Sequence, residues 1–414
     1  MRAMRTLLLG VALLWAGAPR AEPLTSDAVP PAATGVRVTV IAEGIARPWA
    51  LAFLPDGTML VAERRGRLLL VRDGQVDPRP IEGLPPIYVA GSAEHLAGMA
   101  DLVLHPDFAR NRTIFFSYAH GTPERNQTRL ARAVLDGHRL RDLRVIFSAE
   151  PEKVSYGAFG SRIAFLPDGT LLFTVGDGGD VPVGPDGRMP QENAQDLSTH
   201  MGKVVRINED GSVPRDNPFL GRVAPQARGE GVPQARGEGA PQARGERGAR
   251  GEIYALGSRN SQGLAWDPIR RTAWFTDHGA RGGDELNRLE AGRNYGWPVV
   301  THSRQYDPDA RIGTGTAAPG MTDPVIVWTQ ATAPSGLLVY TGDRFPAWRG
   351  DLLSGGLMSK DVRRIRLDAR GRVLGEETIP VGERVRDVRQ GPDGYIYLLT
   401  DRYRAGRILR LEPE

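Results

Sequence analysis

One short phrase recurs along the chain and constrains its fold more than any other feature. It consists of an apolar segment, a turn in which Pro stands next to Asp or close to it, usually with Gly, and a second apolar segment. Pro presets the turn and Gly takes its left-handed position, so the phrase predicts a β-hairpin. It occurs at Trp49–Val61, Leu102–Tyr118, Arg162–Val175, Leu264–Thr276 and Val388–Thr400.

The spacing of this phrase predicts an all-β protein, a six-bladed β-propeller. The interval from Pro55 to Pro392 accommodates six copies, and a fifth blade fits Pro334–Leu367. Four strands per repeat would close into a ring around a central axis. No long stretch shows the spacing of apolar residues that an amphipathic helix needs. A pair of β-sandwiches is the alternative architecture, and the even spacing of the phrase argues against it.

The N-terminus predicts the compartment. Residues 1–21 have the pattern of a bacterial secretory signal, with Arg2 and Arg5 before an apolar run and small residues at 16–18. Residues 22–35 are predicted to be a Pro/Ala-rich linker, and residues 36–414 a single propeller domain. No later run approaches the roughly twenty apolar residues of a membrane span. We therefore expect a periplasmic or secreted protein without a membrane span.

A low-complexity insertion interrupts the propeller pattern at about residues 222–251. Three octamers of the type PQARGEG follow one another from Pro225, and they contain almost nothing apolar. Such a segment cannot bury enough surface to offset its ordering entropy, so we expect a disordered loop. A basic docking arm is one interpretation. Repeat slippage without function is favoured, because each octamer balances Arg against Glu.

Composition and motifs exclude several classes of function. The 53 Lys and Arg are spread among 49 Asp and Glu, without the concentrated basic face of a nucleic-acid-binding protein. The chain has no cysteine, so disulfides and thiolate metal sites are excluded. Nucleophile-elbow, Walker and dinucleotide motifs are missing as well. A hard cation held by backbone carbonyls would leave no side-chain signature.

Candidate functional residues gather in Ile253–Pro298, where two strands at Gly263–Asp267 and Thr272–Thr276 lead into a loop rich in Gly, Asp, Arg and His. Loops of different blades converge at the channel of a propeller, which makes this stretch a candidate site. Arg384 and Arg386 stand at i and i+2, so on a strand they point the same way and could bind a carboxylated or phosphorylated ligand. The alternatives are a polar loop held by Asp–Arg pairs and an exposed, charged strand face.

Taken together, these features make the chain resemble the soluble, pyrroloquinoline-quinone (PQQ)-dependent aldose sugar dehydrogenases, the glucose/sorbosone dehydrogenase group. The resemblance covers about residues 36–412. It rests on several phrases in the same order: RPWALAFLPDG, LVLHPDFARNR, FGSRIAFLPDGTL, AQDLSTHMGKVVRINEDGSVPRDNPF, GSRNSQGLAWDP, DHGARGGDELNRLEAGRNYGWP and VRDV. The resemblance implies a six-bladed propeller that oxidises the C1 hydroxyl of aldose sugars and passes the electrons to an external acceptor.

The resemblance also implies roles for individual residues. Arg259 and Asn260 match the pair that contacts the quinone, and Arg384 and Arg386 match the arginines that bind its carboxylates. Gly279 and Ala280 match the two residues whose backbone carbonyls hold a calcium ion. Trp328 matches an aromatic position beside the cofactor.

Three positions depart from the family pattern. Ala158 stands where the family has its general-base histidine, and Leu96 stands where a glutamine is usual. Met358 replaces a cofactor-contacting lysine, although Lys360 would share its face of a strand. His95 and Tyr156 are candidate substitutes for the missing base. The resemblance thus favours a PQQ- and calcium-dependent sugar dehydrogenase, and the departures favour an impaired relative that binds a ligand or a partner.

Overall fold

The computed structural model describes residues 23–26, 29–32, 35–90, 97–179, 189–222, 248–306 and 312–414. The predicted signal at 1–21, most of the predicted insertion at 222–251, and the positions His95 and Leu96 lie outside the described residues. Among the residues that are described, no helix is long and apolar enough to cross a membrane.

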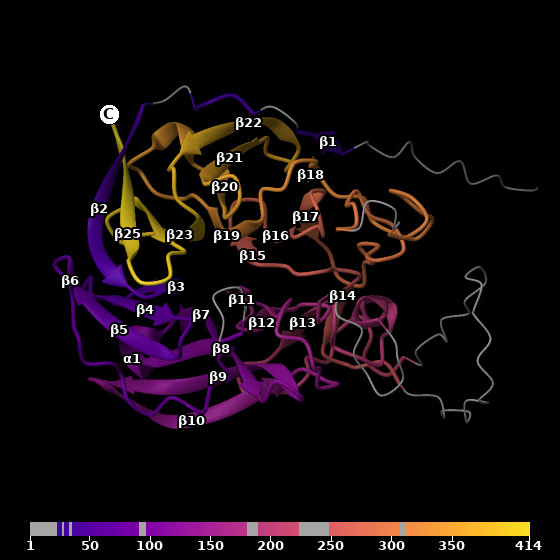
Figure 1. The fold of residues 1–414 in the computed structure, drawn as a ribbon, viewed down its shortest axis with the longest axis horizontal. Helices are drawn as coiled ribbons and strands as arrows, with labels where there is room; N and C mark the ends of the chain where they lie inside the picture. The colour runs from indigo at the N-terminus through magenta and orange to yellow at the C-terminus, as the bar shows by residue number, and fades with distance from the viewer. Residues whose placement is uncertain are drawn as a thin grey trace, which may run out of the picture.

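Six small antiparallel sheets stand in a ring, so the predicted six-bladed propeller is confirmed (Figure 1). Blade 1 holds β3 (Pro48–Phe53), β4 (Met59–Glu63), β5 (Arg67–Arg72) and β6 (Gln75–Val76). Blade 2 holds β7 (Met99–Leu104), the short helix α1 (Phe108–Asn111), β8 (Thr113–Gly121), β9 (Asn126–Asp136) and β10 (Arg139–Ser148). Blade 3 holds β11 (Gly160–Phe165), β12 (Leu171–Val175), the 3-10 turn η1 (Pro190–Gln195), β13 (Lys203–Ile207) and β14 (Ile253–Leu256).

The second half of the chain repeats this order. Blade 4 holds β15 (Gly263–Asp267), β16 (Thr272–Asp277), β17 (Asp284–Leu289) and β18 (Ile326–Trp328). Blade 5 holds β19 (Pro334–Val339), the 3-10 turn η2 (Pro346–Trp348), β20 (Leu352–Gly356), β21 (Asp361–Leu367) and β22 (Val373–Pro380). Blade 6 holds β23 (Val385–Gln390), β24 (Ile396–Thr400), β25 (Gly406–Pro413) and the N-terminal strand β2 (Val36–Ile45).

The recurrent phrase forms the hairpin of the two innermost strands in its blade. In blade 1, the N–H of Leu54 donates to the carbonyl of Thr58 at 2.8 Å, and Gly57 has a φ of 84°. The phrases at Arg162–Val175 and Val388–Thr400 close in the same way, through Gly169 and Gly394. The turn chemistry in the sequence therefore positions the inner strands, which bring functional groups to the axis.

The two ends of the propeller domain close the ring. Strand β2 pairs antiparallel with β25 from Val36 opposite Pro413 to Ile45 opposite Gly406. Blade 6 is therefore built from both termini. The inner strands β3, β7, β11, β15, β19 and β23 pack against one another in this order around the axis.

The segment predicted to be a linker is in part bound to the propeller. Strand β1 (Leu24–Thr25) pairs in parallel with β18, and Pro31 bridges to Thr378. Both partners belong to the outermost strand of a blade, where backbone groups would otherwise be unpaired. Pro/Ala content by itself does not show which free sheet edge an extended chain will find.

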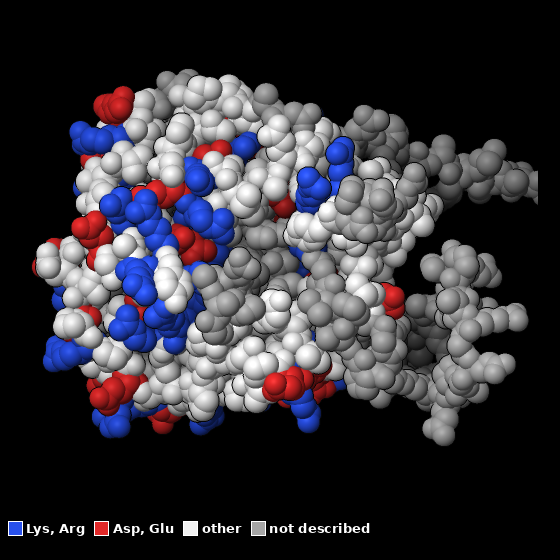
Figure 2. Space-filling view, viewed as in Figure 1, with Lys and Arg blue, Asp and Glu red and all other residues white. Residues whose placement is uncertain are grey.

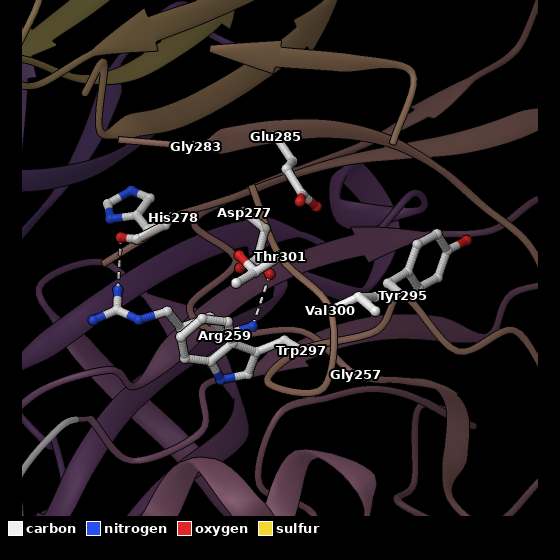
Figure 3. Close-up of a pocket in the computed structure, with 11 residues that line it drawn as sticks. Gly257, Arg259, Asp277, His278, Gly283, Glu285, Tyr295, Trp297, Val300 and Thr301 are labelled. Atoms are coloured by element: carbon white, nitrogen blue, oxygen red, sulfur yellow. Dashed lines mark hydrogen bonds between the residues drawn. The ribbon is translucent and has the colours of Figure 1, made fainter. Parts of the chain in front are cut away.

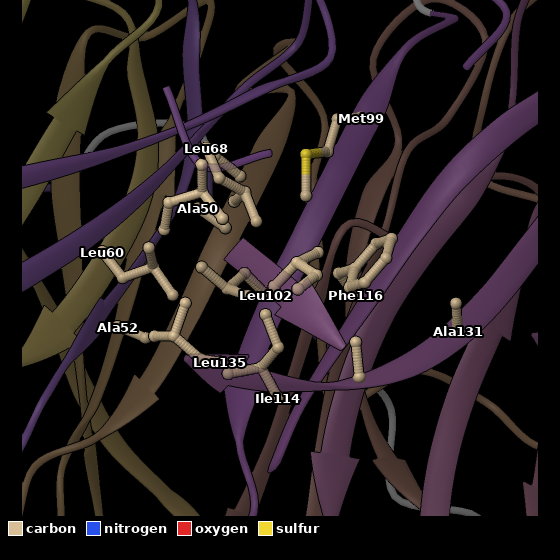
Figure 4. Close-up of a cluster of buried hydrophobic side chains, with 14 of the residues drawn as sticks. Ala50, Ala52, Leu60, Leu68, Met99, Leu102, Ile114, Phe116, Ala131 and Leu135 are labelled. Atoms are coloured by element: carbon tan, nitrogen blue, oxygen red, sulfur yellow. The ribbon is translucent and has the colours of Figure 1, made fainter. Parts of the chain in front are cut away.

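Apolar side chains fill the space between neighbouring blades. Between blades 1 and 2, for example, Leu60, Leu68, Leu102 and Phe116 are fully or almost fully buried in one cluster (Figure 4). Burial of each such side chain contributes about 1.5–3 kcal/mol. This alternation of sheet and apolar layer keeps the blades at fixed angles to one another.

A buried network of charges joins the inner strands at the axis. The Nη1 atom of Arg162 lies 3.1 Å from Asp101 and 2.8 Å from Asp387, and Arg389 contacts the same two carboxylates at 2.6 and 2.8 Å. The carboxylates also accept backbone N–H groups, Asp101 from Ile163 and Asp387 from Leu51. The network therefore links β3, β7, β11 and β23.

Replacing Asp101 by alanine is expected to lower the free energy of unfolding by about 3–5 kcal/mol, because two guanidinium groups would lose a shared buried partner. Urea unfolding followed by tryptophan fluorescence measures this loss. The matched control is Asp136→Ala, which removes a carboxylate from an exposed pair with Arg141 and should cost about 1 kcal/mol or less. Equal losses in the two variants would contradict the role assigned to the network.

Candidate functional site

A polar pocket lies where blades 3 and 4 meet, at the end of the stretch that the sequence singles out (Figure 3). Residues from the end of blade 3, from the β16–β17 loop and from the segment after β17 surround it. The lining residues are Gly257, Arg259, Asp277, His278, Gly279, Gly283, Glu285, Tyr295, Trp297, Val300 and Thr301.

Asp277, the last residue of β16, organises the turn that carries Arg259 and Asn260. Its carboxylate accepts the backbone N–H of each at 2.7 Å, and the hydroxyl of Ser261 donates to it at 3.1 Å. The side chain of Asn260 in turn accepts the N–H of Gly160 at 3.0 Å. The turn is therefore fixed on both sides, toward β16 and toward the segment that contains Ala158.

Gly279 and Ala280 occupy the β16–β17 loop, which Asp284 and Ser303 hold in place. The N–H of Gly279 donates to Asp284 at 2.9 Å, and that of Ala280 to the Ser303 hydroxyl at 2.6 Å. The carbonyl of Gly279 accepts a hydrogen bond from Nη1 of Arg259 at 2.9 Å (Figure 3). A carbonyl oxygen has two lone pairs, so this bond leaves the second available to another ligand.

Two carboxyl groups on neighbouring strands line this pocket. Asp277 and Glu285 are opposite residues of β16 and β17. Burial raises the pKa of Asp277 to about 7, against the hydrogen bonds from the backbone of Arg259 and Asn260. Burial and the neighbouring Asp277 raise the pKa of Glu285 to about 8. A group of positive charge placed here would favour the ionised form of both.

His278 is neutral at physiological pH. Burial lowers its pKa to about 4, and the nearby Asp284 only partly opposes this. Its Nε2 lies 2.6 Å from the carbonyl of Pro334, and because a carbonyl only accepts, the proton sits on Nε2. The charges of Arg259 and Arg386 both act on this imidazole. Arg259 donates to the carbonyl of Gly279, the next residue, and Arg386 to the hydroxyl of Ser335, which follows Pro334, so one arginine of each set singled out in the sequence lies near His278.

Arg384 and Arg386 share one carboxylate, although Arg384 precedes β23 and is the more exposed of the two. Arg386 is 1% exposed and contacts Asp401 at 2.5 Å, while Arg384 lies 3.9 Å from the same group. Arg64 approaches Asp401 at 3.6 Å. Burial opposes ionisation of Asp401, but Arg386 and Arg64 lower its pKa below the usual range. Arg64 and Asp401 were missed in the sequence, since neither stands in a recognisable motif.

The indole of Trp328 does not line the pocket, although the carbonyl of Trp328 accepts the N–H of Gly283 at 2.9 Å. Trp328 ends β18, the fourth strand from the axis, and its side chain is 1% exposed within the core between blades 4 and 5. The indole N–H donates to Glu376 of β22 at 2.7 Å. The prediction that Trp328 contacts a cofactor is therefore corrected, because an outer strand carries this residue away from the channel.

The segment with Ala158 lacks an imidazole but contains a buried lysine. Ala158 is 5% exposed with a φ of 46°. The Nζ of Lys153 donates to the carbonyl of Gly157 and lies 3.6 Å from the centre of the Phe159 ring. Burial lowers the pKa of Lys153 to about 7, partly offset by Asp177. Tyr156, the other described candidate base, is 45% exposed.

Met358 and Lys360 belong to the turn between β20 and β21, and both are exposed. Met358 contacts Nη1 of Arg384 through its sulfur at 3.8 Å. The expectation that Lys360 shares a strand face with Met358 was wrong, because the chain leaves β20 at Gly356 and Lys360 has a φ of 57°.

Comparison with known proteins agrees with this architecture. The sequence profile of the glucose/sorbosone dehydrogenase family matches residues 45–228 and 236–410. An uncharacterized protein of Synechocystis sp. is 45% identical over 381 residues, which are 91% of this chain and 86% of the relative. The aldose sugar dehydrogenase YliI of Escherichia coli is 35% identical over 401 residues, 94% of this chain and 96% of the relative.

A solved structure of the PQQ-bound form of aldose sugar dehydrogenase from Streptomyces coelicolor superposes with a TM-score of 0.69 and 26% sequence identity. The match covers 93% of this chain and 100% of the other. Since the family profile covers most of both halves of the propeller, the chain belongs to the glucose/sorbosone dehydrogenase family.

Proposed function

We propose that the protein is an exported quinoprotein that oxidises the C1 hydroxyl of aldose sugars with PQQ and calcium and passes the electrons to an external acceptor. The observation that carries the proposal is that Arg259 and Arg386 bind the chain on either side of His278: Arg259 donates to the carbonyl of Gly279, and Arg386 donates to the hydroxyl of Ser335, next to the Pro334 carbonyl that His278 contacts. The aldose sugar dehydrogenase of E. coli and the PQQ-bound Streptomyces structure support the substrate class and the cofactor. The signal-like pattern of residues 1–21 supports export.

The arginines at the channel suit the carboxylates of PQQ. Arg64 and Arg386 are both buried, and the Nε of each has no hydrogen-bond partner within the described part of the chain. Buried donors without partners are costly, and a carboxylate can accept two guanidinium N–H groups at once. We therefore assign these two arginines, with Arg384 at the surface, to cofactor binding. PQQ, when bound, would accept the hydride from the sugar carbon.

The oxygen atoms around the β16–β17 loop suit calcium. Calcium prefers carboxylate and carbonyl oxygens, and the pocket offers Asp277, Glu285 and the carbonyl of Gly279. Among the residues with described positions, no cluster of three or more Asp, Glu, His or Cys side chains forms a metal site on its own. Carbonyls such as those of Gly279 and Ala280 would have to complete the coordination.

Proton transfer is the part of the reaction that the described residues supply least well. Ala158 has no group that can take a proton from the sugar hydroxyl. Lys153 is in the same segment, and with a pKa of about 7 it is partly neutral at physiological pH. The second candidate function follows from Ala158: an impaired family propeller that binds a ligand or partner without turnover.

Reconstitution distinguishes these two functions. Purified protein supplied with calcium and PQQ is expected to show a cofactor absorption band and to reduce a redox dye with a panel of aldoses. Binding of the cofactor without dye reduction would support the impaired propeller. Neither binding nor dye reduction would contradict the proposed dehydrogenase.

Introducing Ala158→His is expected to raise kcat by about 10²–10⁴-fold, the usual contribution of a general base. The gain should follow a single pKa in the pH profile, since the new imidazole must be neutral to accept a proton. Steady-state dye reduction between pH 5 and 9 measures both quantities. Ala158→Gln is the matched control, because it fills the same space without a basic nitrogen and should give no gain.

The raised pKa values of Asp277 and Glu285 predict that the calcium-free protein loses stability as pH rises. A carboxyl whose pKa is raised on folding binds more protons in the folded state, so it reduces stability as pH rises from about 4 to the folded pKa. For Asp277 and Glu285 that window ends at about 7 and 8. Without calcium, Glu285→Gln should therefore gain stability relative to the native chain as pH rises from 5 to 8.

Calcium should offset the destabilisation that the two carboxylates cause in the native chain at higher pH. In the native chain, 1–10 mM calcium is expected to raise Tm on the order of several degrees, and this increase should grow with pH. The increase should be smaller in Glu285→Gln than in the native chain. Differential scanning calorimetry measures both effects. Glu290→Gln, at an exposed residue paired with Arg293, is the control. An equal calcium effect in Glu285→Gln and in the native chain would contradict the assignment.

A further inference from the structure

Arginines surround an exposed tyrosine where blades 6 and 1 meet, next to the channel. The guanidinium carbons of Arg47, Arg65 and Arg404 lie 4.8, 4.7 and 5.8 Å from the centre of the Tyr403 ring, which is 42% exposed. Figure 2 shows Lys and Arg gathered on this part of the molecular face, over β23, β25 and β3–β5. We call this surface, made of Arg47, Arg65, Arg384, Arg402, Tyr403 and Arg404, the arginine collar.

The collar is a fixed surface, although it consists of turns. The N–H of Arg47 donates to the carbonyl of Arg402 at 2.9 Å, and the N–H of Arg64 donates to the carbonyl of Arg47 at 3.0 Å. The N–H of Asp401 donates to the carbonyl of Arg384 at 2.8 Å. Backbone hydrogen bonds thus tie the turns of four separate chain segments together.

The carboxylates beneath the collar are already paired. Asp401 lies between Arg386 and Arg64, Glu63 contacts Arg67, and Glu383 contacts Arg402 and Arg407. Within the described part of the chain, Arg65 and Arg404 have no carboxylate partner within ion-pair distance. Exposed arginines elsewhere often do, as in the pairs Arg110–Asp107, Arg141–Asp136 and Arg372–Asp368. The collar therefore carries an excess of positive charge.

We propose that the arginine collar is the docking surface for an acidic one-electron redox protein. The proposal rests on the proposed function, which leaves electrons to be taken by an external acceptor. Oxidation of an aldose to its lactone removes two electrons and two protons from the sugar. Two acceptor molecules, docking in turn, would each be reduced by one electron, and the two protons would pass to water.

Position and composition favour a protein acceptor over a small anion. Asp401 contacts Arg384 and Arg386, which the proposed function places at the cofactor, so the collar is the surface next to the electron source. Arginine and exposed tyrosine are enriched in protein interfaces. A positive face steers an acidic partner and raises the association rate by about 10–10³-fold at low salt. The guanidiniums are spread over several turns, which is more than a single small anion could contact.

The test compares acceptors with the PQQ- and calcium-loaded full chain. An acidic c-type cytochrome, a basic c-type cytochrome and neutral 1,4-benzoquinone serve as probes, and the variant is Arg65→Glu with Arg404→Glu. At low ionic strength the second-order rate constant for the acidic cytochrome is expected to fall at least about tenfold, and its salt dependence should flatten. The rate with the basic cytochrome should rise, and that with benzoquinone should stay unchanged.

Arg144→Glu is the matched control, because Arg144 is an exposed arginine on β10, the outermost strand of blade 2. An unchanged rate with the acidic cytochrome, or an equal loss in Arg144→Glu, would overturn the proposal. So would a loss with benzoquinone as large as that with the acidic cytochrome. Arg65→Gln with Arg404→Gln provides a second variant with less charge repulsion and should show a smaller change in the same direction.

Binding of the acidic cytochrome tests the collar without turnover. Isothermal titration at low salt is expected to show at least about tenfold weaker binding for the Arg65→Glu, Arg404→Glu variant than for Arg144→Glu. If the native chain oxidises no sugar with benzoquinone, the proposed function fails, and the titration still decides whether the collar binds an acidic protein. Equal binding by both variants would overturn the docking proposal.

Discussion

The buried ion pairs of Arg162 and Arg389 with Asp101 and Asp387 are the interaction on which the rest of this structure depends. A charge that is moved from water into a protein interior is costly unless opposite charges and hydrogen bonds compensate it. Here each carboxylate also accepts a backbone N–H from the inner strand of another blade. The network can be satisfied only when those inner strands stand in one register, so it specifies how the blades face one another.

The same physical arrangement recurs where the blades end at the channel. Asp277 holds the turn of Arg259 and Asn260 through two backbone N–H groups, and Asp284 holds the β16–β17 loop in a similar way. Loops held by buried carboxylates keep their ligand-binding groups in place before any ligand arrives, which reduces the ordering cost of binding. Burial raises the pKa values of both Asp277 and Glu285, and the neighbouring Asp277 raises that of Glu285 further.

The structure contains side chains suited to the proposed cofactor binding but fewer suited to the proposed proton transfer. The proposed binding groups are held in place: Arg259 over Trp297, and Arg386 between Gln262 and Asp401. The resemblance implies a proton acceptor at position 158, where this chain has alanine. Lys153 is the one group of the described segment 153–160 whose surroundings bring its pKa near neutrality. The arginines proposed to bind the cofactor, Arg64, Arg259 and Arg386, come from different blades, so a change at position 158 leaves them in place.

Local chemistry was sufficient to predict the blades from the sequence. Pro, Asp and Gly determine a turn over a few residues, and strands β15 and β16 accordingly lie within one residue of their predicted bounds. The two-residue repeat of a strand did not apply to Arg384 and Arg386, because Arg384 precedes β23 and the pairing with β24 shifts between Val385 and Asp387. The hairpin turns concern neighbours in the chain, where the geometry is nearly the same in every protein.

Tertiary structure decided everything that depends on distance from the axis and on burial. Trp328 and Trp297 are equally aromatic in the sequence, yet one lies in the outer core and the other lines the pocket. Burial in the folded chain alters the proton affinities of Lys153, Asp277 and Glu285. Strand β1 binds an edge strand some 300 positions along the chain. The sequence by itself determined which segments form hairpins and repeat. Only the closed ring determined which side chains meet, because those meetings are set by packing between blades.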